Sequence, residues 1–574
     1  MVEEADSWLT VVREITHRLV RLRAVSPSRD EAEVARAVYA MLCADGCAAA
    51  YQVSGLDALT DDPYERHNVF ALVRGRRPET LVLLGHCDTV GTDDYGPLAP
   101  WATDPAGLAQ RVDALEALDP DLRADLAAHP DDWLFGRGSV DMKAGVAVHI
   151  ALMRRLAAAA AAGAPPGVSV LFLATPDEEH ESAGALHAVR LLLRLRREHG
   201  LHYIGVLNTD YSTAEYPGDA QRYVYNGTIG KLLPTVLAIG QESHVGQPFD
   251  GLDANLLAAE LIREVSMDED LCDRVNGQVA PPPVTLRAAD LKARYDVQLP
   301  FAAYFCLNVL TLETDPTALL ERVRRRAEVA LRRTLERVDA TEARWNAAAG
   351  RPARAAGPRV GLVLMYDELR GRAIARLGAE QVALQLAAGA SQWPADLDTR
   401  ERCARLAQWL WTLSGLRGPA FVLLYAPPYY PHVPAMPGLL QDAVRQVIAA
   451  HPEHALVERG MYPYVSDLSY VGLAASVDTT GLTANMPIWH ESDVAPPAAA
   501  YALPLASMRE LALPVVNFGP YGRGAHRAGE RVLMSYSFDA LPRLLWEVIE
   551  RVGAQVVQGT PPQSEMPEGQ LHGG

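Results

Sequence analysis

Short apolar runs and longer stretches of helical periodicity alternate through the first part of the chain. Residues 81–84, 168–174 and 204–207 are compact apolar runs of strand length. Residues 143–162 and 183–197 have the composition and spacing of helices. Strands that alternate with helices are typical of a parallel or mixed sheet covered by helices on both faces. We therefore expect an α/β domain in this part of the chain.

The pattern changes after about residue 225. Residues 229–239, 294–299 and 302–312 predict strands, and residues 253–265 and 315–348 predict helices, of which the second is long and charged. This order suits a small sheet with helices on one face, which is a separate α+β domain.

Apolar runs in the style of the first domain return at 421–425 and 514–519, so the α+β domain is predicted to be inserted into the first. The predicted divisions are a first domain in two parts, 1–225 and 417–558, an inserted domain, 226–370, a helical extension, 371–416, and a disordered tail rich in proline, glycine and glutamine, 559–574. The stretch 92–132 is a long excursion between two motifs, rich in aspartate and proline.

Length and charge narrow the class of protein. A chain of 574 residues exceeds what one hydrophobic core usually supports. With 53 basic and 71 acidic side chains, the net charge is −18, which argues against general binding to nucleic acid or to an anionic membrane. The first residues lack the pattern of a secretory signal, and no apolar run reaches membrane-spanning length without a charge or a proline. Six cysteines without a CxxC pair indicate reduced thiols, so we expect a cytoplasmic protein.

Histidines and acids stand where the apolar runs end. His86, Glu179 and Asp210 each follow a predicted strand, Asp141 stands at a loop–helix junction, and His526 follows a strand and a glycine-rich turn. Strand ends in an open α/β sheet deliver their side chains into one crevice. Imidazole and carboxylate groups are ligands of zinc and related first-row ions. Each residue alone has an ordinary interpretation as a turn, a cap or a surface residue. Together, in this order, they predict a two-metal hydrolytic centre.

Neighbouring residues have properties that suit such a centre. Asp88 falls on the same face as His86 if the chain is extended, and its carboxylate can hold the second N–H of the imidazole there. The two oxygens of Asp141 can bridge two ions. Glu178 and Glu179 point to opposite sides of an extended chain, so one can bind metal while the other acts as a general base.

These segments resemble those of the M20 family of metallopeptidases and amidohydrolases. The matching segments are 85–90 (GHCDTV), 136–143 (GRGSVDMK), 177–179 (DEE), Asp210 and 524–526 (GAH). Within the family, the chain is most like the arginine-utilisation branch. The resemblance implies a zinc-exopeptidase-like fold, with a mixed and mostly parallel sheet, and an inserted ferredoxin-like α+β lid domain. It implies a metal-dependent hydrolase that cleaves an amide or peptide bond in a small, dipeptide-like substrate.

The resemblance also implies which residues bind metal. His86 and Asp210 are expected to bind one divalent ion and Glu179 and His526 the other, with Asp141 bridging the two. Zinc is the expected ion, and cobalt and manganese stay open because ligand type alone does not fix the metal.

Further roles follow from the same resemblance. Glu178 is expected to be the general base that takes a proton from water, and Asp88 to be the partner of His86. In the inserted domain, His244 is expected near the scissile carbonyl, where the family often takes this histidine from the partner subunit of a homodimer. Asn255 follows as a candidate substrate residue.

The chain departs from the family pattern at one strand. Residues 305–310 contain no arginine, although many members hold the substrate carboxylate with one at the matching place. Asp467 is a candidate for binding a cationic group such as a guanidinium, and a turn aspartate is an equally good interpretation. Two alternatives stay open: an aminopeptidase without an inserted lid, and a catalytically silent binding or regulatory protein on the same scaffold. The absence of a Gly-x-Ser-x-Gly motif argues against a serine hydrolase.

Overall fold

The computed structural model describes residues 7–117, 119, 121–275, 277–354, 357–394, 397–490 and 501–559. The chain divides into two compact units. The first comprises the described residues of Met1–Gly227, Ala435–Arg459 and Leu513–Gly574, and the second those of Thr228–Pro434 and Gly460–Ala512. The predicted disordered tail, 559–574, lies outside the described residues except for Gly559.

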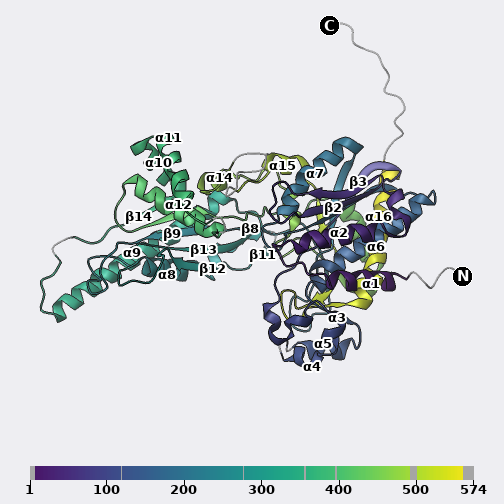
Figure 1. Cartoon of the computed structure of the whole chain (residues 1–574), viewed down its shortest axis with the longest axis horizontal. Helices are drawn as coiled ribbons and strands as arrows, with labels where there is room; N and C mark the ends of the chain where they lie inside the picture. The colour runs from purple at the N-terminus through teal and green to yellow at the C-terminus, as the bar shows by residue number, and fades with distance from the viewer. Residues whose placement is uncertain are drawn as a thin grey trace, which may run out of the picture. The chain divides into compact units, whose positions relative to one another are not determined.

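An eight-stranded mixed sheet forms the centre of the first unit, in the order β1-β2-β5-β3-β6-β17-β7-β16. Figure 1 labels β2 and β3 of this sheet. The strands are Val53–Ala58 (β1), His67–Val73 (β2), Val168–Thr175 (β5), Arg77–His86 (β3), His202–Asn208 (β6), Val515–Asn517 (β17), Arg222–Asn226 (β7) and Leu456–Arg459 (β16). The central strands β5, β3, β6 and β17 are parallel, whereas β2 and β7 pair antiparallel with their inner neighbours. The expected mixed α/β sheet is confirmed.

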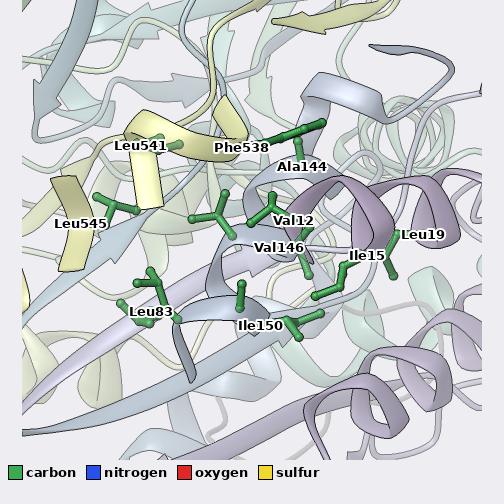
Figure 2. Packing of buried hydrophobic residues seen from close by; sticks show 14 of the residues in the cluster. Val12, Ile15, Leu19, Leu83, Ala144, Val146, Ile150, Phe538, Leu541 and Leu545 are labelled. Carbon is green, nitrogen blue, oxygen red and sulfur yellow. The ribbon is translucent and has the colours of Figure 1, made fainter. Parts of the chain in front are cut away.

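One face of this sheet carries a large hydrophobic cluster. Its helices are α1 (Trp8–Val20), α2 (Asp30–Leu42), α6 (Ala144–Ala161), α13 (Leu439–Ala450) and α16 (Leu541–Gly559). Val12 of α1, Val146 and Ile150 of α6, and Leu83 of β3 belong to this cluster, as Figure 2 shows. Because side chains alternate along a strand, Val82 points to the other face. There α7 (Ala183–His199) contacts β2 and β5.

The long excursion after β3 is packed rather than loose. It contains η2 (Asp93–Trp101), α3 (Pro105–Ala109), α4 (Val112–Glu116) and α5 (Leu122–Ala128). Leu98, Leu108, Leu115 and Leu122 are all buried in the main cluster. The excursion leads into β4 (Trp133–Phe135), which forms a three-stranded sheet with β18 (Gly522–Arg523) and β19 (Arg531–Leu533).

One stretch of helix among the described residues, Ser139–Ala161, is long and apolar enough to cross a membrane by length and composition. About two thirds of its apolar window, 67%, is buried inside the protein. The stretch contains α6, which packs between the sheet and α1. Core packing therefore accounts for its apolar composition.

The second unit is built on a six-stranded sheet in the order β12-β13-β9-β15-β14, with β8 paired to β13. The strands are Gly230–Leu232 (β8), Pro234–Ile239 (β9), Val284–Asp290 (β12), Ala302–Thr311 (β13), Leu362–Met365 (β14) and Ala420–Tyr425 (β15). A small hairpin is formed by β10 (Arg274–Val275) and β11 (Gln278–Val279). The helices are α8 (Ala254–Val265), α9 (Pro316–Ala348), α10 (Tyr366–Leu377), α11 (Ala379–Ala390), α12 (Thr399–Ser414), α14 (Thr480–Asn485) and α15 (Leu505–Leu511).

Three sequence predictions are contradicted by the structure of this unit. The sequence predicts that the run 421–425 belongs to the first domain, but it forms β15, which pairs with β9 and β14 in the second sheet. The extension 371–416 is part of this unit, because α12 contacts β9 and β13. Residues 294–299, all of them described, form no strand, and the strand lies at β12 instead. β12 is an edge strand with mostly exposed side chains, so it lacks the apolar alternation that marks a buried strand.

Candidate metal centre

The five predicted ligands come together in the first unit. His86 ends β3, Glu179 follows β5, and Asp210 follows β6. Asp141 lies in the turn before α6, and His526 lies in the turn between β18 and β19. Because β3, β5 and β6 are parallel, their carboxyl ends meet at one edge of the sheet. The sheet topology thus explains how residues far apart in the chain reach one place.

Asp141 stands between the two histidines. Its Oδ1 lies 3.1 Å from Nε2 of His86, and its Oδ2 lies 3.1 Å from Nε2 of His526. Nε2 of His526 is also 3.0 Å from Oε1 of Glu179. Three overlapping sets result, His86–Asp141–Asp210, His86–Glu178–Glu179 and Asp141–Glu179–His526, and within each set the possible ligand atoms lie within 4.8 Å of one another. Asp141 belongs to the first and the third, one oxygen facing each histidine.

Burial makes this group of carboxylates electrostatically costly without cations. Burial, followed by the charge of Asp141, raises the pKa of Asp210 to about 7 and also raises the pKa of Glu179. Burial opposes ionisation of Asp141 as well, but hydrogen bonds from His526 and His86 bring its pKa below the usual range. Two imidazoles and three carboxylates are a donor set that divalent first-row ions prefer, and such ions relieve the repulsion.

The two histidines differ in exposure. His86 is buried; although desolvation opposes its protonation, hydrogen bonds to Asp141 and Asp88 raise its pKa well above the usual value. The side chain of His526 is 50% exposed, and its hydrogen bonds to Asp141 and Glu179 raise its pKa to about 11. The centre is therefore closed on the His86 side and open to solvent on the His526 side.

Asp88 connects His86 to the acidic loop after β5. It is fully buried, and its Oδ1 lies 3.5 Å from Nδ1 of His86. The same oxygen accepts a hydrogen bond from the backbone N–H of Glu178 at 3.1 Å, and Oδ2 accepts one from Glu179 at 3.0 Å. One carboxylate thus faces the imidazole and holds the backbone of both acids of the loop. Oε2 of Glu178 lies 3.9 Å from Nε2 of His86, close to the ligand atoms.

A buried ionic network that sequence reasoning missed lies beneath the acidic loop. Arg66 forms ion pairs with Asp177, with Glu31 at 3.4 Å and with Asp62 at 2.8 Å. Glu31 accepts a hydrogen bond from the backbone N–H of Asp177 at 2.8 Å, and Ser26 donates one to Oδ1 of Asp177 at 2.9 Å. Asp177 has a positive φ of 73°, so these contacts hold a backbone turn that directs the next two residues toward the metal centre.

A second missed group supports the turn of Asp141. Glu530 is buried and accepts hydrogen bonds from the backbone N–H groups of Val140 at 3.1 Å and Asp141 at 3.3 Å. Arg137 binds Glu530 at 2.8 Å and Asp94 at 2.7 Å. Burial raises the pKa of Glu530 to about 7. The sequence contained part of the signal for this group, because Arg137 lies inside the glycine-rich motif at 136–143.

Three other predicted residues belong to the second unit. His244 is exposed, and its Nδ1 accepts a hydrogen bond from the backbone N–H of Gly246 at 3.1 Å. Asn255 lies in the first turn of α8, and Asp467 is buried at the start of η6 (Asp467–Tyr470). Their roles stay predictions.

An α/β sheet with overlapping His–carboxylate sets at the carboxyl ends of its parallel strands and in the turns beside them is typical of the class of dinuclear metallohydrolases. The family model for peptidase family M20/M25/M40 matches residues 82–496. The chain belongs to this family of metal-dependent peptidases and amidohydrolases, and the resemblance found in its motifs is confirmed.

The similar proteins agree with this assignment. The uncharacterized protein YqjN of Bacillus subtilis (strain 168) is 33% identical over 536 residues, which cover 92% of this chain and 93% of YqjN. Protein RocB of the same strain is 32% identical over 502 residues, 85% of each chain. A tripeptidase from Staphylococcus aureus subsp. aureus mu50 is 12% identical with a TM-score of 0.50, covering 95% of this chain and 99% of the tripeptidase. At that identity, the last likeness shows a shared fold.

Proposed function

We propose that this protein hydrolyses an amide or peptide bond in a small amino-acid-derived substrate and that two divalent ions serve the reaction. His86 and Asp210 would hold one ion, Glu179 and His526 the other, and Asp141 both. The observation that carries this proposal is the position of Asp141, whose two oxygens face two different histidines at 3.1 Å each. Zinc is the proposed ion, since imidazole and carboxylate ligands suit it.

The chain's own residues supply the proton transfer and the orientation. When bound, the ions would polarise the substrate carbonyl and lower the pKa of a nearby water molecule. The Glu178 carboxylate takes a proton from that water and passes it to the leaving amine. Asp88 holds the backbone of Glu178, so the carboxylate is positioned before substrate arrives.

The substrate class follows from resemblance and from the second unit's residues. We propose an N-acyl amino acid or a dipeptide, and we include arginine derivatives because the chain is most like the arginine-utilisation branch. Asp467 would hold a cationic group, Asn255 would contact substrate, and His244 would stabilise the oxyanion. The absence of an arginine in 305–310 supports a substrate whose carboxylate is not held in the usual way.

The remaining proposals concern surroundings and assembly. The net charge of −18 supports binding of small molecules rather than of nucleic acid or membranes. We propose a cytoplasmic location. We also propose a homodimer formed through the second unit. Its support is the edge strand β12, where Leu286 is 60% exposed and, among the described residues, the backbone pairs with a strand on one side only.

The deciding experiment replaces Glu178 by glutamine in zinc-loaded protein. A panel of N-acyl amino acids and dipeptides first identifies a substrate. Glu178→Gln should then lower kcat by about 10²–10⁴-fold at unchanged metal content, because the amide cannot accept the proton. Glu181→Gln, in the same acidic segment, is the matched control and should keep wild-type turnover. Near-wild-type kcat in Glu178→Gln with intact metal content removes Glu178 as the base, and full turnover after chelation removes the metal mechanism.

A further inference from the structure

A second cluster of histidines and carboxylates lies at the edge of the first unit's sheet. η5 (Pro452–His454), the short turn between α13 and β16, contains Glu453 and His454, and His451 precedes it. Glu547 reaches this turn from α16, which packs against α13. β16 is the edge strand, four strands from β3. At about 4.8 Å per strand, the cluster is separated from the end of β3 by roughly 19 Å along the sheet.

Three side chains of the cluster converge. Oε1 of Glu453 lies 3.1 Å from Nδ1 of His451 and 3.8 Å from Nε2 of His454. One possible ligand atom from each of the three lies within 4.8 Å of the other two. Ligand atoms bound tetrahedrally at about 2.0–2.2 Å lie roughly 3.3–3.6 Å apart. These two separations lie on either side of that range, and the possible ligand atoms of His451 and His454 lie within 4.8 Å of each other, so the three side chains can converge on one ion after adjustment.

The second nitrogen of His451 is already held. Its Nε2 lies 2.7 Å from Oε2 of Glu547, whose Oε1 accepts a hydrogen bond from Nε of Arg551 at 2.8 Å. A carboxylate that binds the distal N–H of a histidine fixes its tautomer and raises the basicity of the other nitrogen, as it does for metal-binding histidines in general. Nδ1 of His451 then faces Glu453, and both groups need a positive charge between them.

A proton on Nδ1 would satisfy His451 and Glu453, whereas an ion would also use Nε2 of His454, which lies 3.8 Å from the same carboxylate oxygen. His454 is fixed independently: its ring packs edge-on against Tyr536, and its carbonyl oxygen accepts a hydrogen bond from Arg222 at 3.0 Å. An imidazole beside a carboxylate and a second histidine is a metal-ligand arrangement.

We propose that His451, Glu453 and His454 bind a divalent first-row transition ion of the zinc class, with Glu547 as a positioning residue for His451. Two imidazoles favour such an ion over calcium or magnesium, which prefer oxygen ligands. Glu453 is 60% exposed, which leaves room for water on the ion. The ion would bind within the turn before β16, and the hydrogen bond between His451 and Glu547 connects that turn to α16. This site is distinct from the centre at Asp141.

Zinc counting by mass spectrometry on the full chain tests the proposal. The protein is equilibrated in a zinc buffer, and zinc per chain is measured for wild type, His454→Ala and Glu453→Gln. Each variant should bind about one zinc fewer than wild type, with hydrolase activity unchanged. The difference of one is independent of how many ions the centre at Asp141 holds, so failure of the proposed function leaves this test intact. His202→Ala, an exposed histidine of the same unit, is the matched control and should keep the wild-type count.

Equal zinc counts in wild type, His454→Ala and Glu453→Gln would overturn the proposal. A residue-level readout on wild-type protein covers the case of a variant that does not fold. Zinc should slow the reaction of His451 and His454 with diethyl pyrocarbonate several-fold and leave His202 unaffected, as measured by peptide mass spectrometry. Unchanged reactivity of His454 in saturating zinc would also overturn the proposal. Glu547→Gln should weaken zinc binding at this site by about 10-fold or more without removing a ligand.

Discussion

Replacing Asp88 by asparagine exchanges one carboxylate oxygen for an NH2 group and keeps the shape of the side chain. In the protein, Oδ2 accepts the N–H of Glu179, while Oδ1 accepts the N–H of Glu178 and faces Nδ1 of His86. An amide has one acceptor, so either orientation places its NH2 against a backbone N–H. The fully buried site offers no water in exchange.

The magnitude follows from these contacts. A hydrogen bond to a charged group contributes about 1.5–3 kcal/mol, so Asp88→Asn should lower the unfolding free energy of the metal-free protein by roughly that amount. Loss of the carboxylate that orients a metal-binding histidine lowers metal affinity by about 10–100-fold, or about 1.4–2.7 kcal/mol. Both effects can be measured before any substrate is known.

The assays are urea unfolding in the presence of a chelator and zinc competition with a chromophoric chelator. Asp253→Asn is the matched control. Asp253 caps α8 and accepts a single backbone N–H, from Asn255 at 2.8 Å, which the amide oxygen of asparagine can accept equally well. The control should change stability by less than about 0.5 kcal/mol. If Asp88→Asn keeps both wild-type stability and wild-type zinc affinity, the reasoning about two oxygens and two N–H groups is refuted.

Two further predictions concern Gly145 and His149, which both lie in α6. A Cβ at Gly145 would lie 2.0 Å from the carbonyl oxygen of Thr209, so Gly145→Ala should destabilise the protein by roughly 2–4 kcal/mol in urea unfolding. Gly371→Ala, in an open position of α10, should stabilise it by about 0.5–1 kcal/mol, and equal effects at both sites would contradict the packing argument. Burial lowers the pKa of His149 to about 3, so below pH 6.5 the unfolded chain binds a proton that the folded protein does not. Metal-free wild type should therefore lose about 1.4 kcal/mol per pH unit through this group from pH 6.5 downward, and His149→Gln should show a shallower acid dependence of its unfolding free energy; parallel pH profiles for the two would disprove it.

The sequence predicted the candidate site well because its signal is local. His86 and Asp210 come directly after buried apolar runs, and parallel strands bring such positions to one edge. The supporting residues carry no such signal. Glu31 lies in the first turn of α2, where an acid usually faces solvent, and only the folded chain shows that it meets Arg66 and Asp177. Glu530 likewise lies 393 residues from its partner Arg137.

The second unit was harder to predict for a related reason. β15 is buried and apolar, and such a run fits either sheet equally well, because burial does not say which neighbour a strand has. β12 was missed because a strand at an exposed edge needs no apolar alternation. The places of β15 and β12 in the second sheet therefore depend on their pairing partners, which strand propensity does not reveal.

Glu179 and His526 face each other across 347 residues of chain. On a ribosome that adds about 5–20 residues per second, His526 is synthesised roughly 20–70 s after Glu179. A nascent chain therefore carries these acids without His526 for most of its synthesis. The set Asp141–Glu179–His526 is complete only after the last part of the polypeptide has been made and has docked.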